Sequence, residues 1–368
     1  MPDAAPPGQV VAHSAPRSHA YIGSPSLVRL PNRDLIASHD LFGPGSSRDT
    51  TVLYRSADEG ATWSRLAELT GQWWSNLFWH DGALYLMGTT TEYGDVVIRR
   101  SDDGGVSWTT PDSPPNGLLL QGEYHTAPVP VVIASGRLWR ALEDASGGDG
   151  WGERFKALVM SAPLGADLLD ATSWTSTKPL ERQSDWLPAG CRAWLEGNVV
   201  VAPDGQLVDV LRVDSDDNHR MRAAVVRVSP DGTAATFDPE SDFITMPGGL
   251  TKFTIRHDAV TGEYLSLVNH VADPARWQLG LRARNTLCLA RSADLRTWTV
   301  SEPLLHHADD KHHAFQYVDW QFDGRDLIYL SRTAWDEPDG TPAHNYHDAN
   351  YLTFHRLPDF RGLVTRPA

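Results

Sequence analysis

The nine residues Ser56–Ser64, "SADEGATWS", form a short phrase that the chain repeats. It returns as "SDDGGVSWT" at Ser101–Thr109 and, shortened, as "SADLRTWTV" at Ser292–Val300. Each copy follows an apolar run of a composition that is typical of a strand. Because aspartate side chains bond nearby backbone N–H groups and glycine accepts positive φ, each phrase predicts a tight turn between two strands. The third copy lacks the glycine and one residue, so we expect a tighter turn there.

A second pattern alternates with these turns. "DGALYLMGTTT", "SGRLWRALEDA", "DGQLVDVLRVD", "TGEYLSLVNHV" and "DGRDLIYLSRT" share a glycine turn, an apolar strand and polar residues at its far end, and "PNRDLIASHD" has Asn for Gly. Together the two patterns give four strands in about fifty residues, the size of a propeller blade. The sequence therefore predicts an all-β fold, a single β-propeller domain over residues 1–368 with residues 1–8 as a flexible tail. We count six blades, at residues 21–70, 71–120, 121–180, 191–247, 248–305 and 312–360.

The ring also has to close. The stretch "GQVVAHSA" near the start of the chain is expected to supply the last strand of the final blade. Seven blades would need a further unit, and we identify none in the sequence.

Composition limits the classes of function. Hydrophobic residues make up 41% and charged residues 21%, as in a folded protein. The net charge of -15 argues against nucleic-acid or acidic-membrane partners. The 14 Trp residues suit a cleft that holds sugar rings, and the two cysteines, Cys191 and Cys288, are expected as buried thiols. We expect a monomer.

The ends of the chain bear on its location. No apolar run is long enough to cross a bilayer, and "MPDAAPPGQ" lacks the layout of a signal peptide. A cytoplasmic protein, or a secreted one whose signal peptide has been removed, fits this sequence equally well.

One rim of the predicted propeller concentrates the reactive side chains. Loops that follow second strands and loops that enter first strands share a face, whereas the other face carries mostly Gly turns. The ends of second strands supply His39, Thr89, Asp144, Asn269, His270 and Arg332. The entries to first strands supply Tyr21, Trp73, Trp74, Asn76, Tyr124, His125, Glu196, Lys252, His313, Gln316 and Tyr317. We therefore expect the functional site on the first rim.

The repeated turn resembles the Asp-box, S-x-D-x-G-x-T-W, of sialidases and related β-propeller enzymes. In that superfamily the boxes lie between third and fourth strands, away from substrate. The resemblance therefore implies that the turns stabilise the blades and are not part of the active site. The first strand, "YIGSPSLVRLP", has Ser24-Pro25 and no Arg that matches the one in the sialidase R-I-P motif. The chain is more similar to propeller enzymes that act on L-rhamnose-α-1,4-D-glucuronate caps of arabinogalactan, which include lyases and α-L-rhamnosidases. The stretches that carry this similarity are "GSPSLVRLPNRDLIASHDLFGPGS", "GEYHTAPVPV", "WLEGNVVV" and "KHHAFQYVDWQFDGRDLIYLSRTAWD".

This second resemblance implies a lyase. Such an enzyme releases L-rhamnose from a uronate-containing oligosaccharide or polysaccharide by β-elimination and leaves a 4,5-unsaturated uronate. The lyases have an essential histidine on the front face, and the resemblance carries that role to His39. The reaction needs a base for the C5 proton, a cation or acid at the carboxylate and an acid at the leaving oxygen.

Several side chains compete for the remaining roles. Tyr124, His125 or Tyr317 would complement His39 in proton transfer, although each can equally just shape the pocket. Arg332, Arg284 and Lys252 compete for the carboxylate. Trp73 and Trp74 would form a sugar platform, although Trp74 can equally pack between blades. The further substrate-binding candidates are Asn76, Glu196, His313 and Gln316.

Two other functions stay open. A glycoside hydrolase commonly uses two carboxylates, and Glu196, Glu143 and Asp144 are available. A propeller that binds sugar without catalysis is the third possibility, because fold does not fix function.

A metal site is also considered. "LLHHADDKHHAFQ", at Leu304–Gln316, holds four His and two Asp, but its spacing fits no standard zinc pattern and a solvated loop explains it as well. "NYHDANY", at residues 345–351, offers oxygen and imidazole donors near the rim. We expect that no cofactor is required. Ca²⁺ in the central channel is the remaining option, without an acidic loop of calcium spacing to support it.

Overall fold

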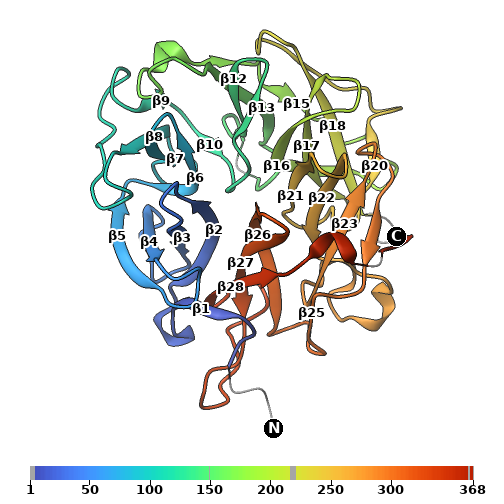
Figure 1. Ribbon diagram of the computed structural model, residues 1–368. Helices are drawn as coiled ribbons and strands as arrows, with labels where there is room; N and C mark the ends of the chain where they lie inside the picture. The colour runs from blue at the N-terminus through green and yellow to red at the C-terminus, as the bar shows by residue number, and fades with distance from the viewer. Residues whose placement is uncertain (1–4, 149, 216–220, 364, 368) are drawn as a thin grey trace.

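A computed structural model describes residues 5–148, 150–215, 221–363 and 365–367 of the chain. Its strands form six antiparallel sheets arranged as blades around a central axis (Figure 1). The predicted six-bladed β-propeller is therefore confirmed. The described residues contain no α-helix, and the short 3-10 helices are η1 (Pro16–Ser18), η2 (Ala171–Ser173), η3 (Pro274–Arg276), η4 (Gly280–Arg282) and η5 (Phe360–Gly362).

The blades follow one another along the chain. Blade one consists of β2 (Tyr21–Arg29), β3 (Leu35–Phe42), β4 (Thr50–Ser56) and β5 (Ser64–Thr70). Blade two consists of β6 (Trp73–His80), β7 (Ala83–Thr89), β8 (Val96–Ser101) and β9 (Leu118–Leu120). Blade three consists of β10 (Tyr124–His125), β11 (Val132–Ala134), β12 (Arg137–Asp144), β13 (Lys156–Pro163), β14 (Thr175–Ser176) and β15 (Leu180–Glu181).

The other three blades complete the ring. Blade four consists of β16 (Cys191–Val201), β17 (Leu207–Ser215), β18 (Arg222–Val228), β19 (Ala235–Thr236) and β20 (Phe243–Thr245). Blade five consists of β21 (Thr254–Asp258), β22 (Glu263–Val268), β23 (Thr286–Ser292), β24 (Thr299–Ser301), β25 (Leu305–His306) and β29 (Thr365–Pro367). Blade six consists of β26 (Ala314–Asp323), β27 (Asp326–Ala334), β28 (Tyr351–Leu357) and β1 (Gln9–His13).

Both ends of the chain are used as strands. β1 pairs antiparallel with β28, which confirms that the N-terminal segment closes the ring. Residues 1–4 of the predicted flexible tail lie outside the described residues, but Gly8 is packed: a Cβ there would lie 2.6 Å from the backbone oxygen of Phe354. β29 adds to the outer edge of β24, a pairing that the sequence did not predict. This short strand covers an edge that would otherwise be open.

The hydrophobic core lies between neighbouring blades. In β3, Leu35 and Ala37 pack against Leu330 of blade six, whereas Ile36 packs against Leu84 of blade two. Each sheet thus buries both faces, which explains why many strands read as continuous apolar runs. Cys191 and Cys288 are free, buried thiols, as expected.

The repeated phrases are turns at the end of the blades opposite the polar rim. They connect third to fourth strands in blades one, two and five. In the first turn, Asp58 Oδ1 accepts hydrogen bonds from the Thr62 backbone N–H (2.9 Å) and the Ser56 hydroxyl (2.8 Å). The Thr62 hydroxyl is the first of several hydrogen-bond donors that lower the pKa of Asp58 to about 2. Asp103 and Asp294 accept equivalent bonds in the other two turns.

The turns also join blades. The Trp63 ring lies 5.4 Å from the ring of Phe354, which belongs to blade six. In the shortened copy, Leu295 occupies the left-handed region at φ 62° and its carbonyl accepts from Trp298 Nε1 at 3.2 Å. Leu295 is 2% exposed in the core between blades four and five, and this burial offsets the strain of positive φ.

A fourth turn of this kind lies in blade four, where the sequence pattern predicted none. Ser229 donates to Asp231 Oδ1 at 2.6 Å, and the same oxygen accepts from the Thr233 backbone N–H at 3.1 Å. The stretch "SPDGT" lacks the tryptophan that marks the other copies, so the pattern was incomplete.

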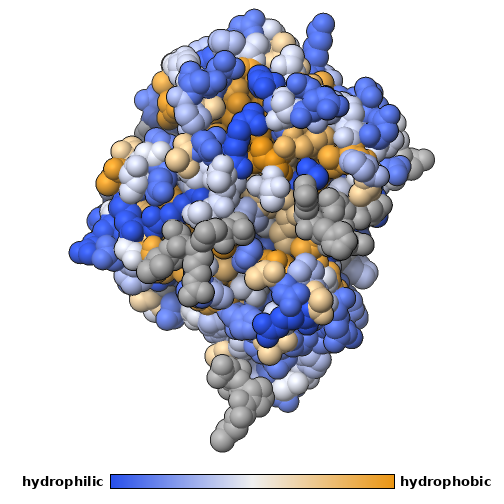
Figure 2. Space-filling view, turned by 90° about the vertical axis from the view of Figure 1, so that its right-hand side faces the viewer, coloured by the Kyte–Doolittle hydropathy of each residue, from blue (hydrophilic) through white to orange (hydrophobic). Residues whose placement is uncertain are grey.

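The outer surface is mainly polar. In the view of Figure 2, hydrophilic side chains cover most of the molecule, and apolar ones show in hollows between them. No helix among the described residues is long and apolar enough to span a membrane.

Candidate active site

Three inner strands are interrupted at the same level of the propeller. β6, β16 and β26 each contain a register shift, and a bulky residue beside each shift has positive φ. These residues are Trp74 (φ 47°), Glu196 (φ 58°) and Tyr317 (φ 52°). Positive φ is costly for large side chains, and bulges re-aim side chains. All three line one pocket, so the strained positions of these strands converge on a single site.

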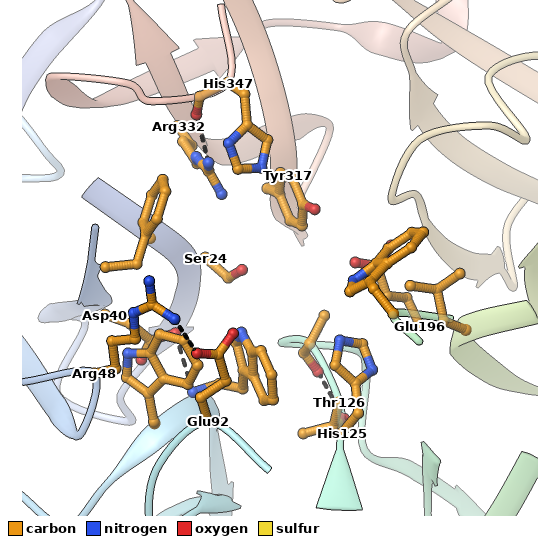
Figure 3. A pocket seen from close by; sticks show the side chains of 17 residues that line it. Ser24, Asp40, Arg48, Glu92, His125, Thr126, Glu196, Tyr317, Arg332 and His347 are labelled. Atoms are coloured by element: carbon orange, nitrogen blue, oxygen red, sulfur yellow. Dashed lines mark hydrogen bonds and ion pairs between the residues drawn. The ribbon is translucent and has the colours of Figure 1, made fainter. Parts of the chain in front are cut away.

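The pocket has a volume of about 190 Å³ and opens on the polar rim (Figure 3). Ring planes, carboxylates, imidazoles and cations surround it. Its lining residues are Gly23, Ser24, Asp40, Phe42, Arg48, Trp73, Trp74, Glu92, His125, Thr126, Ala127, Trp151, Leu195, Glu196, Tyr317, Arg332 and His347.

Asp40, near the end of β3, is the most perturbed carboxyl group of the pocket. Asp40 is 1% exposed. A Cβ on Gly23 of β2 would lie 2.8 Å from the Cβ of Asp40, so β2 packs closely against this side chain and shields it from solvent. Burial raises the pKa of Asp40 to about 8, against the opposing effects of hydrogen bonds from Thr51 and Trp74 and of the Arg332 charge. The side chain is therefore a protonated acid at neutral pH.

The hydrogen bonds around Asp40 agree with a bound proton. The Thr51 hydroxyl lies 2.9 Å from Asp40 Oδ1 and 2.7 Å from the carbonyl oxygen of Gln72. A hydroxyl has one proton, and a carbonyl can only accept. If Thr51 donates to Gln72, a proton on Asp40 Oδ1 completes the second bond. The other oxygen, Oδ2, accepts from the Trp74 backbone N–H at 3.0 Å.

Glu196 lies across the pocket from Asp40 (Figure 3) and is in the opposite state. Its Oε2 accepts from Arg212 Nη1 at 2.9 Å, and both side chains are buried. Burial favours the neutral form of Glu196, but the charges of Arg212, His125 and Arg284 outweigh it and lower the pKa. The pocket thus holds one ionised carboxylate and one protonated carboxyl group.

Cations gather around Tyr317. The guanidinium of Arg332 lies 4.7 Å from the Tyr317 ring centre, and that of Arg284 lies 5.4 Å away. Arg332 also stacks on Phe42 at 4.4 Å and donates through Nη2 to the backbone carbonyl of His347. Burial lowers the pKa of Arg332 to about 10, so it stays charged at neutral pH. Within the described part of the chain it forms no ion pair with a carboxylate.

His125 has a fixed orientation on the pocket wall. Its Nδ1 lies 2.7 Å from Glu143 Oε2, and Glu143 is fully buried. The imidazole stacks on Phe155 with ring centres 4.3 Å apart and meets the edge of Trp74 at 4.4 Å. Because Glu143 contacts Nδ1, Nε2 is the ring nitrogen left for another partner.

His39 is not part of the pocket lining, which corrects the expected placement of this side chain. Successive side chains of a strand point to opposite faces, and His39 shares the face of Leu35 and Ala37 that packs on blade six. Its ring stacks on Tyr54 at 5.7 Å, and burial lowers its pKa to about 4. Its neighbour Asp40 points to the other face and reaches the pocket. The role that the resemblance assigns to His39 stays a prediction without a contact in this pocket.

Other candidates are also placed outside the lining. Tyr124 packs into the core between blades two and three, because it alternates with His125 along the strand. Asn76 donates to the Leu77 carbonyl, and Lys252 Nζ donates to Thr254 Oγ1 at 2.6 Å and to the Val318 carbonyl at 2.9 Å. Burial lowers the pKa of Lys252 to about 8.

A second layer supports Tyr317. Arg284 Nη1 donates to Gln316 Oε1, and Gln316 Nε2 donates to the backbone carbonyl of Tyr346. Neither Arg284 nor Gln316 lines the pocket, so both are placed to position other groups. Of the carboxylates considered for hydrolysis, Glu143 lies behind His125 and Asp144 faces Lys156 at 3.7 Å, so only Glu196 reaches the pocket.

The histidine-rich loop does not assemble a ligand set. His313 bonds Asp309 at 3.2 Å and stacks on His307 at 3.5 Å, whereas His312 bonds the Ala343 carbonyl. The described residues contain no group of three or more His, Cys, Asp or Glu side chains that could hold a metal ion.

Six residues that the sequence predicted on one rim line this pocket, and their role in function stays a prediction: Trp73, Trp74, His125, Glu196, Tyr317 and Arg332. Sequence reasoning did not single out Asp40, although counting strand faces from His39 would have found it. Ser24, Phe42, Arg48, Glu92, Trp151 and His347 were also missed. Most of these lie in loops that carry no periodic pattern.

The fold recurs in solved structures of low sequence identity, whereas no family profile and no curated protein sequence matches the chain. The α-L-arabinanase of Penicillium chrysogenum, solved with arabinobiose, matches with a TM-score of 0.59 and 15% identity over 97% of this chain and 99% of that one. The GH93 α-L-arabinofuranosidase of Fusarium graminearum, also solved with arabinobiose, matches with a TM-score of 0.58 and 12% identity over 95% of this chain and 97% of that one. Trypanosoma rangeli sialidase matches with a TM-score of 0.57 and 14% identity over 94% of this chain and 55% of that one. These similarities establish a shared propeller fold.

Proposed function

We propose that this protein is an exo-acting glycoside hydrolase that removes a terminal sugar residue from an oligosaccharide. The observation that carries the proposal is the pairing of a protonated Asp40 with an ionised Glu196 across one small pocket. Glycosidases commonly need one carboxyl group that donates a proton and one that stays charged. The structural neighbours that process arabinosides and sialosides support a carbohydrate substrate.

In this mechanism Asp40 is the general acid. It protonates the glycosidic oxygen as the bond to the terminal sugar breaks. Glu196, held by Arg212, supplies negative charge on the opposite side of the sugar ring. There it stabilises the positive charge that develops and accepts the proton of the group that attacks the anomeric carbon, which is either water or the Tyr317 hydroxyl. If Tyr317 attacks, water then hydrolyses the glycosyl-tyrosine, with ionised Asp40 taking the proton of that water and Glu196 returning a proton to Tyr317.

The sugar class is proposed to be acidic. Arg332 is a buried cation in a protein of net charge -15, and within the described residues no carboxylate pairs with it. A buried guanidinium without a protein carboxylate beside it favours a carboxylate on the ligand, which it can bind through two parallel hydrogen bonds. A uronate or another carboxylate-bearing sugar meets that requirement.

A β-eliminating lyase acting on L-rhamnose-α-1,4-D-glucuronate caps is the second candidate. The position of Arg332 beside Tyr317 favours it, since a cation and a phenol could neutralise the carboxylate and move the proton. The absence of His39 from the pocket lining weighs against it.

One assay separates these candidates. The protein is incubated with a rhamnose-capped glucuronide and with terminal glucuronides, sialosides and arabinofuranosides. Released sugar and ultraviolet absorbance are then recorded. A hydrolase releases sugar without absorbance, whereas a lyase releases rhamnose with rising absorbance from the conjugated 4,5-double bond. Binding without either product identifies a non-catalytic sugar-binding propeller.

A further inference from the structure

Trp151, in the loop between β12 and β13, is an exposed aromatic side chain at the pocket. It has 50% of its surface exposed and also lines the pocket. The other large hydrophobic side chains exposed in the described part of the chain are valines and one isoleucine, and none of them lines this pocket. An exposed indole beside a polar pocket offers a flat apolar face on which a sugar ring can stack, with its N–H available to a polar group.

The loop holds this indole in a fixed place. Gly152 has φ 77°, and a Cβ there would lie 2.5 Å from the Cβ of Ala193, so the turn is pressed onto β16. The Trp151 ring meets Phe155 edge-on with centres 5.9 Å apart. Phe155 is fully buried and stacks in turn on His125. A continuous aromatic contact therefore connects Trp151 to the wall of the pocket.

Arg154 fixes the base of the same loop. Its guanidinium donates to the Ala145 carbonyl and to Glu123, and it lies 4.7 Å above the ring of Tyr93. The side chain is 12% exposed although it is charged. Because Gly152 and Arg154 anchor the residues next to Trp151, the indole loses little conformational entropy when it binds a ligand.

The volume of the pocket limits how much of a sugar chain it can hold. About 190 Å³ is below the roughly 300–1,000 Å³ of typical ligand sites, and it suits a single sugar ring. The next residue of an oligosaccharide must then leave through the mouth. The mouth offers the half-exposed indole of Trp151 together with the paired side chains Arg48 and Glu92, which also line the pocket.

We propose that Trp151 is the stacking platform for the second sugar residue of the substrate, which makes an oligosaccharide chain, and not a small glycoside, the preferred ligand. The proposal rests on the proposed function for the identity of the terminal sugar. The apolar face of the second sugar lies on the indole, and its hydroxyl groups reach Arg48 and Glu92.

Binding of matched ligands tests the platform. The probes are glucuronosyl-galactose, rhamnosyl-glucuronate and sialyl-galactose, each compared with its terminal monosaccharide by titration calorimetry and saturation-transfer NMR. Trp151→Ala should weaken disaccharide binding about tenfold and leave monosaccharide binding within about twofold. Trp151→Phe should restore part of the loss. Ile133→Ala, at an exposed apolar residue outside the pocket, is the control and should change neither.

The outcomes keep the two proposals apart. Equal loss for both ligand sizes, no loss, or disaccharides that never bind more tightly than their monosaccharides would overturn the platform. Disaccharide binding that depends on Trp151, without cleavage of any probe, rejects the hydrolase and supports the platform. Cleavage of a probe, with a disaccharide affinity that does not depend on Trp151, supports the hydrolase and rejects the platform.

Discussion

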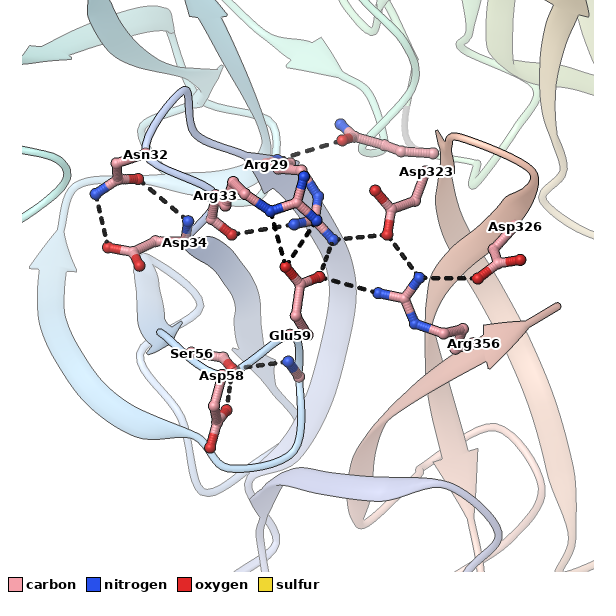
Figure 4. Close-up of polar contacts among 12 residues, drawn as sticks. Arg29, Asn32, Arg33, Asp34, Ser56, Asp58, Glu59, Asp323, Asp326 and Arg356 are labelled. Carbon is pink, nitrogen blue, oxygen red and sulfur yellow. Dashed lines mark hydrogen bonds and ion pairs between the residues drawn. The ribbon is translucent and has the colours of Figure 1, made fainter.

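The boundary between blades six and one carries charged side chains at both of its ends, and the two groups differ in how they are paired. At the turn end, Arg29 donates to Glu59 at 2.7 Å and to Asp323 at 2.8 Å (Figure 4). Arg356 bridges Asp323 at 2.6 Å and Asp326 at 3.1 Å in the same network. Every cation of this group has a carboxylate partner.

The pocket end of the same boundary is organised in the opposite way. Among the described residues, Arg332 contacts a carbonyl and two aromatic faces and no carboxylate. On the other face of blade one, toward blade two, Asp40 keeps a proton that free aspartate would have lost. Buried charge without a partner is costly, so the rigid blades must hold it in place. The comparison teaches that paired charges join blades six and one at the turn end, whereas the pocket end leaves Arg332 without a carboxylate among the described residues.

Loss of the pocket acid should have the largest effect. We expect Asp40→Asn to lower kcat about 10²–10⁴-fold, because the amide cannot donate the proton. The wild type should lose activity as pH rises through about 8, where Asp40 ionises, and keep it on the acid side until Glu196 is protonated below its ordinary pKa. A pH–rate profile measures both limbs. Near-normal turnover by Asp40→Asn removes this residue from the mechanism.

Arg332 should be the next most sensitive position. Arg332→Lys keeps the charge and loses the two-pronged geometry, so we expect kcat/KM to fall about tenfold, and about a hundredfold for Arg332→Ala. The comparison uses a glucuronide and the matching neutral glucoside, and only the acidic substrate should show the loss. If the two substrates lose equally, the carboxylate is bound elsewhere and Arg284 or Lys252 becomes the candidate.

The unpaired acid should also cost stability at high pH. The folded state keeps a proton on Asp40 up to about pH 8, whereas the unfolded chain releases it near pH 4. Between these values the free energy of unfolding contributed by Asp40 should fall by about 1.4 kcal/mol per pH unit. Asp40→Asn removes this slope, so its stability relative to wild type should increase with pH in urea denaturation. Parallel pH curves for the two proteins contradict the raised pKa.

The turn-end network should give the smallest effect. Arg356 is 31% exposed, and exposed ion pairs contribute about 0–1 kcal/mol each. We expect Arg356→Ala to lower the free energy of unfolding by about 1 kcal/mol, less in high salt, with kcat unchanged. A loss of catalysis in this variant would show that the two ends of the boundary are coupled.

The sequence by itself determined the blades. Turn residues and strand patterns are local signals, and they located six blades, the closing N-terminal strand and the rim that bears His125, Glu196, Tyr317 and Arg332. Each turn depends on a few neighbouring residues, such as Asp58 with Ser56 and Thr62, so reading along the chain suffices. The exception is Leu295, whose positive φ relies on burial that no local pattern reveals.

Only the tertiary structure decided which side chains line the pocket. His39 and Asp40 are adjacent in sequence, yet one faces the core and the other the pocket, because the face toward each neighbouring blade is fixed by the ring and not by the strand. The pKa of Asp40 depends on Gly23, Thr51 and Trp74, which lie on three different strands. Burial and partner charges are properties of the assembled ring, which is why the sequence did not reveal that Asp40, and not His39, faces the pocket.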